Sequence, residues 1–306
     1  MYNLKSVSFS KLNMFAKNPE NFFFRHVLGL KMPPAKAFAQ GRSVHSSLET
    51  HYNQKLQDHK GLPLDEIINI YDKSLISEQE TYEADFAETS SFLPPEYIKN
   101  ETETNFSEMR DVGTKGLIVY KQEVDPGLMP KEVESKFALA TESVDITGRI
   151  DIIDTDGFIR DHKTSKRAPQ ADDAEDDDQL KIYDLAFRTR YGYKPKGYRK
   201  DFIVLTKTPK IVSCKADPMT DYRQKELLRN LNSMIQIMEL TIEKNLWHNW
   251  TVEKWAKDPK WNGYWKVSRD LHLYGLDYVV KKYINKDLSG QDFVNVGERV
   301  AAEMAV

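Results

Sequence analysis

Residues 148–163 read Gly-Arg-Ile-Asp-Ile-Ile-Asp-Thr-Asp-Gly-Phe-Ile-Arg-Asp-His-Lys. Two apolar segments, each containing an aspartate, flank a Thr-Asp-Gly tripeptide at 155–157, and this pattern is typical of a β-hairpin. With a three-residue loop and Gly157 in the left-handed region, strand pairing places Asp151 directly opposite Asp161. Lys163 lies two residues beyond Asp161 on the same strand, so all three side chains project from one face.

This convergence of charges has two explanations. Carboxylates roughly 5 Å apart repel each other unless one is protonated or a cation lies between them. Oxygen ligands favour Mg²⁺ or Mn²⁺, and such an ion holds a phosphate oxygen and lowers the pKa of a bound water, which Lys163 can orient. The hairpin then predicts phosphodiester hydrolysis. Alternatively, the acids and the lysine pair with one another at a solvent-exposed sheet edge.

The composition is that of a globular protein. The chain has 306 residues, of which 40% are hydrophobic, and a formal charge of −3, so contact with nucleic acid must come from local basic patches. A single cysteine, Cys214, excludes a disulfide framework and an iron–sulfur cluster held by this chain's own cysteines. We find no signal-peptide pattern and no segment that would span a membrane, and we expect a cytoplasmic protein of a bacterial or virus-infected cell.

The N-terminal region predicts three helices. Ser10 is expected to cap a short helix through Ala16, and Asn18-Pro19 to start a second one. From Gly41 a strongly helical stretch follows, in which His45, Leu48, Glu49 and Tyr52 share one face. A lone histidine on such a face is usually structural, so its position alone does not make His45 a ligand.

The middle of the chain predicts helices, then strands. Residues 64–88 and 95–123 have helical periodicity, with a kink or break expected near Gly113 and Gly116, and this region is a candidate arch for threading a single strand. A strand at 131–139 contains Glu134. The acidic run at 172–178 is typical of a helix start, although a second metal site is an alternative. That helix places Gln179 and Tyr183 one turn apart, and strands at 198–205 and 211–216 and a helix at 218–244 follow.

The C-terminal region after Leu246 contains all the tryptophans of the chain, at 247, 250, 255, 261 and 265, interleaved with lysines. Aromatic and basic residues in alternation suit stacking on single-stranded bases. A small aromatic core packed against the main sheet is the alternative that we favour, because large aromatic side chains are mostly buried.

With these residues in view, the chain resembles the RecB-like branch of the PD-(D/E)xK nucleases. The resemblance rests on motifs in a fixed order, and together they cover about the first 190 residues. They are Ser8-Phe9-Ser10-Lys11-Leu12, Asn18-Pro19, Gly41 to Glu49 around His45, Glu134, Gly148-Arg149-Ile150-Asp151, Asp161-His162-Lys163-Thr164, and Gln179 with Tyr183. It implies an α/β fold with a restriction-endonuclease-like core, in which a central mixed β-sheet is flanked by helices and carries a helical insertion.

The resemblance also implies roles for individual residues. His45, Asp151 and Asp161 correspond to metal ligands, and His162 to a residue that ligates through its backbone carbonyl. Lys163 corresponds to the catalytic lysine, while Gln179 and Tyr183 support the site and contact DNA. Glu134 is a further candidate member of the catalytic set. One or two Mg²⁺ or Mn²⁺ ions are expected.

The chain departs from many relatives at the iron–sulfur cluster. Those relatives have a cysteine just before the early proline and three more near the C-terminus, whereas this chain has Asn18 and tryptophans. We therefore expect no cluster, and we expect aromatic packing between the tail and the N-terminal helices, carried by Trp261 and Trp265, to replace it.

We accordingly predict one nuclease domain over residues 1–306. It comprises N-terminal helices with the histidine motif (1–62), a helical insertion or arch (63–125), a catalytic α/β core (129–245) and a tryptophan-rich segment packing on the core (246–306). The predicted activity is DNA exonuclease action on single strands or end-bearing duplexes in recombination, repair or viral DNA processing. A helicase or single-strand-binding protein is a candidate partner. The alternatives are an endonuclease of this fold and a non-catalytic DNA-binding or assembly subunit.

Overall fold

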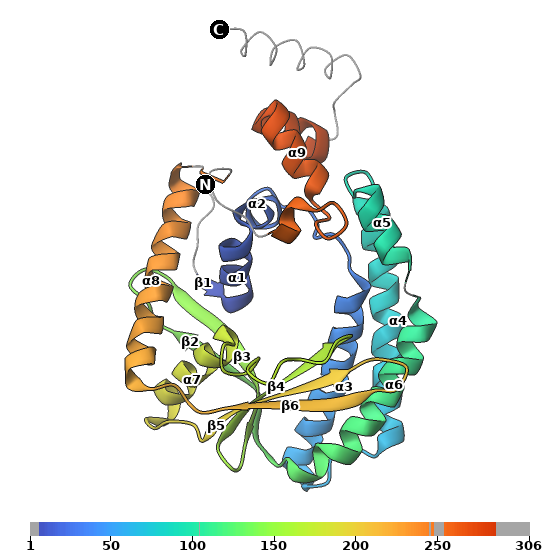
Figure 1. The fold of residues 1–306 in the computed structure, drawn as a ribbon, viewed down its shortest axis with the longest axis vertical. Coiled ribbons are helices and arrows are strands. Elements are labelled where there is room, and N and C mark those ends of the chain that lie inside the picture. Colours follow the sequence, from blue (N-terminus) through green and yellow to red (C-terminus); the bar gives the residue numbers. More distant parts are fainter. Residues whose placement is uncertain (1–5, 104, 245, 248–253, 286–306) are drawn as a thin grey trace.

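The structure is a computed structural model that describes residues 6–103, 105–244, 246–247 and 254–285. The N-terminal half is mostly helical, the central part contains the sheet, and helices follow it (Figure 1). The elements in order are β1 (Ser6–Ser8), α1 (Phe9–Lys17), α2 (Pro19–Phe22), α3 (Lys36–Asp58), α4 (Leu64–Thr89), α5 (Pro95–Thr102), α6 (Phe106–Glu123), β2 (Pro130–Leu139), β3 (Asp145–Asp154), β4 (Phe158–Ser165), α7 (Asp178–Tyr191), β5 (Gly197–Val204), β6 (Lys210–Ala216), α8 (Asp221–Lys244), α9 (Trp265–Tyr274) and α10 (Leu276–Val279).

The sheet is mixed and six-stranded. Its main order is β1-β3-β4-β5-β6, with β2 paired to the other side of β3. β3 pairs antiparallel with β2 and β4, whereas β4 and β5 run parallel and are joined by α7, as a parallel pair requires. Because β3 lies between β2 on one side and β1 and β4 on the other, it holds the hairpin at the centre of the sheet.

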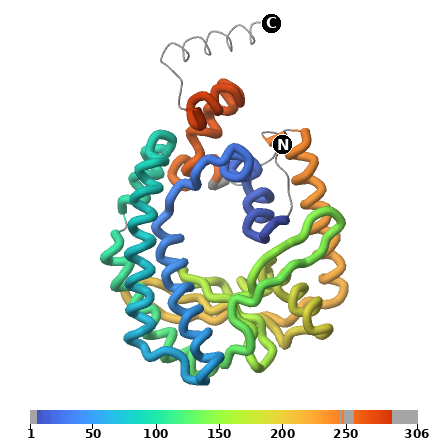
Figure 2. Tube along the Cα trace, turned by 180° about the vertical axis from the view of Figure 1, so that it is seen from behind, coloured from blue at the N-terminus to red at the C-terminus, as the bar shows by residue number. Residues whose placement is uncertain are grey.

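Two hydrophobic clusters flank this sheet. One joins α3, α4 and α6 to the sheet through Leu48, Tyr71, Leu117, Ile152 and Ile203. The other packs α1, α7, α8 and the C-terminal helices around residues that include Ile153 and Phe187. Figures 1 and 2 show α3, α4 and α6 together on one side of the molecule and α8 on the opposite side. The predicted fold class, a central mixed sheet flanked by helices, is confirmed.

The hairpin has the predicted three-residue turn. β3 ends at Asp154, β4 begins at Phe158, and Gly157 has φ +87°, a value that L-residues with side chains rarely adopt. The pairs Ile152 with Arg160 and Ile153 with Ile159 set the register. Continued by one residue, this register brings Asp151 opposite Asp161.

Two helix predictions need correction. Ser8, not Ser10, is the N-cap of α1, since its side chain accepts a hydrogen bond from the amide of Lys11 at 3.4 Å. The helix break falls between α5 and α6, where Asn105 caps α6, and not at Gly113 or Gly116. These glycines are close-packing positions: a Cβ at Gly113 would lie 2.0 Å from Tyr71 Oη, and one at Gly116 would lie 2.6 Å from Leu205 Cδ2.

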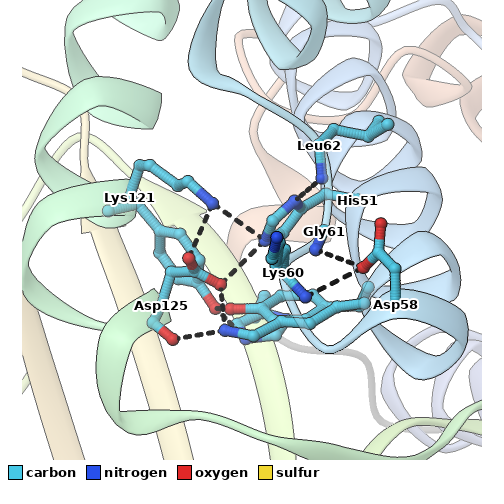
Figure 3. A network of polar contacts seen from close by, with 11 residues as sticks. His51, Asp58, Lys60, Gly61, Leu62, Lys121 and Asp125 are labelled. Atoms are coloured by element: carbon cyan, nitrogen blue, oxygen red, sulfur yellow. Dashed lines mark hydrogen bonds and ion pairs between the residues drawn. The ribbon is translucent and has the colours of Figure 1, made fainter.

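A buried ion network fixes α3 against the end of α6 (Figure 3). Asp125 Oδ1 lies 2.7 Å from His51 Nε2 and accepts a bond from Lys55 Nζ at 2.8 Å, while its Oδ2 accepts one from Lys121 Nζ at 2.7 Å. His51 Nδ1 accepts a bond from the amide of Leu62 at 2.9 Å. Because α3 carries His45, this network also positions one wall of the site described below.

The C-terminal region packs against the N-terminal helices through Trp247 and Tyr264, whereas Trp261 and Trp265 were expected to carry this packing. Trp247 is buried and stacks on Phe23 with ring centroids 4.7 Å apart, and Tyr264 contacts Phe24 at 5.7 Å. Trp261 is 53% exposed, and Trp265 is half-buried. Trp250 and the side chains of Lys254 and Trp255 lie outside the described residues. Among the residues described, no helix is both long and apolar enough to cross a membrane.

Candidate active site

Three carboxylates lie in one row across three neighbouring strands. Val133 pairs with Ile152 and Ser135 with Ile150, so Glu134 on β2 faces Asp151 on β3. The register of β3 with β4 places Asp161 on the other side of Asp151. Asp161 is completely buried, Asp151 is 9% exposed and Glu134 is half-buried, so the row runs from the interior toward the surface.

Glu134 has an unusual backbone. Its φ of +49° lies in the left-handed region, where a residue with a Cβ costs of order 1–3 kcal/mol. The register of β2 with β3 is the same on both sides of this residue, and the Glu134 carboxylate contacts His45, with Oε1 2.6 Å from Nε2. Strain of this kind is found where the surrounding structure requires one side-chain position.

His45 reaches the row from α3, the helix next to the sheet. Its Nδ1 lies 3.7 Å from Asp151 Oδ2, so the imidazole lies between Glu134 and Asp151. Gly41, one turn earlier, allows α3 to approach β4, since a Cβ there would lie 3.3 Å from Thr164 Oγ1. Because Gly41 has no side chain, α3 packs close to β4, and this close packing brings His45 to the carboxylates.

Lys163 and the start of α7 complete the group. Lys163 Nζ lies 3.0 Å from Asp161 Oδ1 and donates to Gln179 Oε1 at 3.1 Å. Gln179 Nε2 in turn donates to Tyr183 Oη at 2.6 Å, as their one-turn spacing on α7 allows. The structure therefore brings the lysine, the glutamine and the tyrosine into one hydrogen-bonded chain beside Asp161.

The acidic run before α7 has a structural role at one position. Asp177 is the N-cap of α7, and its Oδ1 accepts hydrogen bonds from the amides of Gln179 at 2.7 Å and Leu180 at 3.2 Å. The other carboxylate oxygen of Asp177 contacts the ammonium of Lys200. Lys200 on β5 lies opposite Asp161 on β4 in the strand register. Motif analysis could not predict this contact, because Lys200 is distant in sequence and belongs to none of the motifs.

The side chain of His162 points away from Asp151 and Asp161. Its Nε2 lies 2.5 Å from Tyr120 Oη, and its ring stacks on Tyr52 at 5.9 Å with an interplanar angle of 5°. The backbone amide of His162 donates to Asp151 Oδ2 at 3.2 Å. Burial lowers the pKa of the His162 imidazole well below its ordinary value, so the ring is neutral. This orientation leaves only backbone atoms of His162 on the side of the carboxylates.

The pKa values of the group reflect crowded, buried charge. Burial, followed by repulsion from Asp161, raises the pKa of Asp151 to about 7, and burial also raises the pKa of Asp161. The hydrogen bond with Glu134 raises the pKa of His45 to about 9, against the effect of burial. Burial lowers the pKa of Lys163, but Asp161 and Asp151 outweigh it and leave the value above the ordinary one. The raised pKa values mean that bound protons and the ammonium of Lys163 offset the negative charge of the carboxylates.

Comparisons with known proteins identify the family of the chain. A family model described as the PD-(D/E)XK nuclease superfamily matches residues 6–259. The chain belongs to this superfamily. A crystal structure of a proposed exonuclease from Eubacterium rectale is also similar, with 14% sequence identity and a TM-score of 0.46, over 82% of this chain and 90% of that one. A search among curated proteins found no match.

The PD-(D/E)XK nucleases use divalent metal ions, and the residues present fit such an ion. Both carboxylate oxygens of Asp161 are buried and accept no hydrogen bond of ordinary geometry from the described residues, although Lys163 lies close to one of them. Unsatisfied buried oxygens beside a second carboxylate are a suitable environment for a hard cation. Asp161 and Asp151, with His45 beside them, are the residues that suit it.

Glu49 is an additional candidate ligand that the motif analysis did not select. One ligand atom from each of His45, Glu49 and Glu134 can be chosen so that all three lie within 4.8 Å of one another. Glu49 follows His45 by four residues on α3, so the two side chains lie on the same face. The spacing was visible in the sequence, but only the approach of Glu134 makes it a three-residue group.

Proposed function

We propose that this protein is a Mg²⁺- or Mn²⁺-dependent DNA exonuclease of the RecB-like branch of the PD-(D/E)XK superfamily. The observation that carries the proposal is the contact of Lys163 with Asp161 inside a buried group of carboxylates. A lysine beside two facing aspartates, with a histidine 3.7 Å from one of them, is a set of residues suited to metal-dependent hydrolysis of a phosphodiester.

Asp151, Asp161 and His45 would hold the ion, with the carbonyl of His162 as a further ligand and Glu49 and Glu134 around His45. When bound, a divalent ion there stabilises the negative charge of a phosphate oxygen and lowers the pKa of a coordinated water. The burial of Asp161 strengthens these interactions because water competes poorly for a buried oxygen.

The roles of the remaining residues follow from their contacts. Lys163 would donate hydrogen bonds from Nζ to the attacking water or to a phosphate oxygen that gains negative charge. Gln179 accepts from Nζ at 3.1 Å and so fixes the direction of the ammonium. Tyr183 accepts a bond from Gln179, and through it keeps the amide oxygen turned toward Lys163. From the resemblance, we further propose that Gln179 and Tyr183 help to position the DNA strand.

The preference for DNA ends rests on the resemblance of the ordered motifs to RecB-like nucleases. That resemblance also supports a place in recombination, repair or viral DNA processing, with a helicase or single-strand-binding protein as partner. We further propose that the protein holds no iron–sulfur cluster, and that Trp247 and Tyr264 connect the C-terminal region to α2 and the residues after it. Their ring contacts with Phe23 and Phe24 support this part of the proposal.

The proposal is tested by incubating the purified chain with linear and covalently closed DNA in Mg²⁺, in Mn²⁺ and in EDTA. We expect time-dependent shortening of end-labelled linear DNA with either metal and none in EDTA. Brisk cutting of closed circles would show an endonuclease instead. Binding of DNA in EDTA without cleavage under any metal condition would favour a non-catalytic DNA-binding subunit.

A further inference from the structure

Six exposed cations lie on β2, on β3, at the end of α7 and in the segment that follows α7. All six side chains are exposed, in a chain whose formal charge is −3. We call this set the basic track: Arg149, Lys136, Arg190, Lys131, Lys194 and Lys196.

The track begins at the candidate active site. Arg149 Nη1 lies 3.4 Å from Glu134 Oε2, and Glu134 contacts His45. Arg149 also pairs with Lys136 across β3 and β2. Like charges directly opposite each other in a sheet repel, and Glu134 offsets part of this repulsion through its contact with Arg149.

The middle of the track is held in place by the contacts of Arg190. Its guanidinium contacts Glu132, Ser135 Oγ and the carbonyl of Lys136, which connects the last turn of α7 to β2. Glu132 also accepts a hydrogen bond from Tyr191. Glu132 is the acid nearest to this part of the track, and its charge is already offset by these contacts.

The track ends at a cavity of about 250 Å³ beside the β3–β4 turn. Lys131, Lys194 and Lys196 line it together with Phe187 and Tyr193. Two acids, Asp154 and Asp156, also line the cavity, and the charge of Asp154 is offset by Arg160, which donates to it at 2.7 Å. Outside the cavity, Asp221 pairs with Lys194 at 3.0 Å.

An aromatic cluster forms the floor of this end. Tyr193 contacts Phe187 at 5.4 Å and Tyr191 at 5.8 Å, and Lys131 Nζ lies 4.0 Å above the Tyr191 ring. Tyr193 is nevertheless 55% exposed. The segment after it is joined to the β3–β4 turn, because the amide of Lys196 donates to the carbonyl of Gly157 at 2.8 Å. An exposed ring next to lysines matches the requirements for stacking an unpaired base and holding its phosphates.

We propose that the basic track binds one strand of DNA between the active site and this cavity, with Tyr193 stacking on an unpaired base. The inference rests on the proposed nuclease function and names where the strand lies. From Arg149 to Asp154, β3 advances roughly 16 Å, the length of about five stacked nucleotides at roughly 3.4 Å each. A single strand is favoured over a duplex because only an unpaired base exposes its face to a ring.

The test is binding of fluorescent single-stranded DNA of about 20 nucleotides to the full chain in EDTA, followed by anisotropy. The double variant Lys131→Glu/Lys196→Glu should bind at least about 10-fold more weakly and lower the salt dependence by about one unit per lysine. Tyr193→Ala should weaken single-strand binding by about 10-fold and leave duplex binding unchanged. Thermal unfolding of each variant checks that it is folded.

Controls are Lys244→Glu, an exposed lysine at the C-terminal end of α8, and Tyr222→Ala, a tyrosine on α8 that is 68% exposed. Both should bind as wild type does. Unchanged affinity in the track variants, or an equal loss in Lys244→Glu, would overturn the proposal. Equal losses for single and double strands in Tyr193→Ala would overturn the stacking assignment. If the wild type cuts no DNA but the track variants lose binding, the proposed nuclease function is wrong and the proposed binding surface stands. If the wild type cuts DNA and the track variants bind normally, the proposed binding surface is wrong and the nuclease function stands.

Discussion

Lys163 Nζ lies 3.0 Å from Asp161 Oδ1, and the two residues come from alternate positions of the same strand. β4 therefore presents the proposed catalytic lysine and a proposed metal-binding carboxylate on one face without any loop between them. The rigidity of a central strand keeps this pair in position, while His45 and Gln179 approach from helices on either side.

Replacing Lys163 by Ala should lower the cleavage rate by a factor of about 10² to 10⁴, since it removes a donor positioned for the reaction. Lys163→Arg keeps the charge but changes the donor geometry, and it should also be impaired. Single-turnover cleavage of end-labelled DNA in Mn²⁺ measures both. A melting temperature close to that of the wild type shows that the fold is intact, and full activity of a folded Lys163→Ala protein would contradict the assignment.

The backbone of Glu134 predicts an unusual order of stabilities. Glu134→Gly and Glu134→Ala both remove the carboxylate, but only glycine adopts φ +49° without strain. We expect the Gly variant to have the higher free energy of unfolding, by about 1 kcal/mol, whereas in an ordinary strand Ala is the more stable. Urea denaturation of the two proteins measures the difference. If Ala is more stable here too, the strain does not exist.

Trp247 should matter far more for stability than Trp261. Trp247 is 2% exposed and stacks on Phe23, so Trp247→Ala should cost about 3–5 kcal/mol. Trp261 is 53% exposed, and its replacement by Ala should change the free energy of unfolding by less than about 0.5 kcal/mol. Thermal unfolding of both variants provides the comparison, and similar losses would show that burial of Trp247 does not connect the C-terminal region to the N-terminal helices.

Asp125 should make stability depend on pH in the acidic range. Burial raises the pKa of its carboxyl, but hydrogen bonds from His51, Lys121 and Lys55 outweigh burial and hold the pKa well below its ordinary value. A carboxyl whose pKa is lowered by folding stabilises the protein above its unfolded pKa of about 3.9, and this contribution is lost as the pH falls toward its folded value.

The variant Asp125→Asn should therefore be less stable than the wild type by about 3 kcal/mol at pH 7, because it leaves buried Lys55 without its anion. The difference should shrink as the pH falls below about 4. Denaturation at a series of pH values measures it. A difference that stays constant down to pH 3 would mean that ionised Asp125 does not contribute.

The sequence alone determined the hairpin and the order of the motifs. Alternation of side chains along a strand places Asp161 and Lys163 on one face, and Gly157 permits the turn that sets the register of Asp151. These features depend on residues close together in the chain, where local backbone geometry leaves few alternatives. The same holds for Asn18 as the cap of α2 and for the helix spacing of Gln179 and Tyr183.

Only the tertiary structure decided which distant residues join them. The left-handed backbone of Glu134, the approach of Glu49 and the contact of Lys200 with Asp177 depend on how α3, β2 and β5 pack around the hairpin. Gly113 and Gly116 weaken a helix by propensity, yet α6 continues through them because Tyr71 and Leu205 require the space. A glycine inside a helix costs about 1 kcal/mol relative to alanine. Packing against Tyr71 and Leu205 outweighs this cost, so contacts between residues far apart in the sequence decided that α6 is continuous.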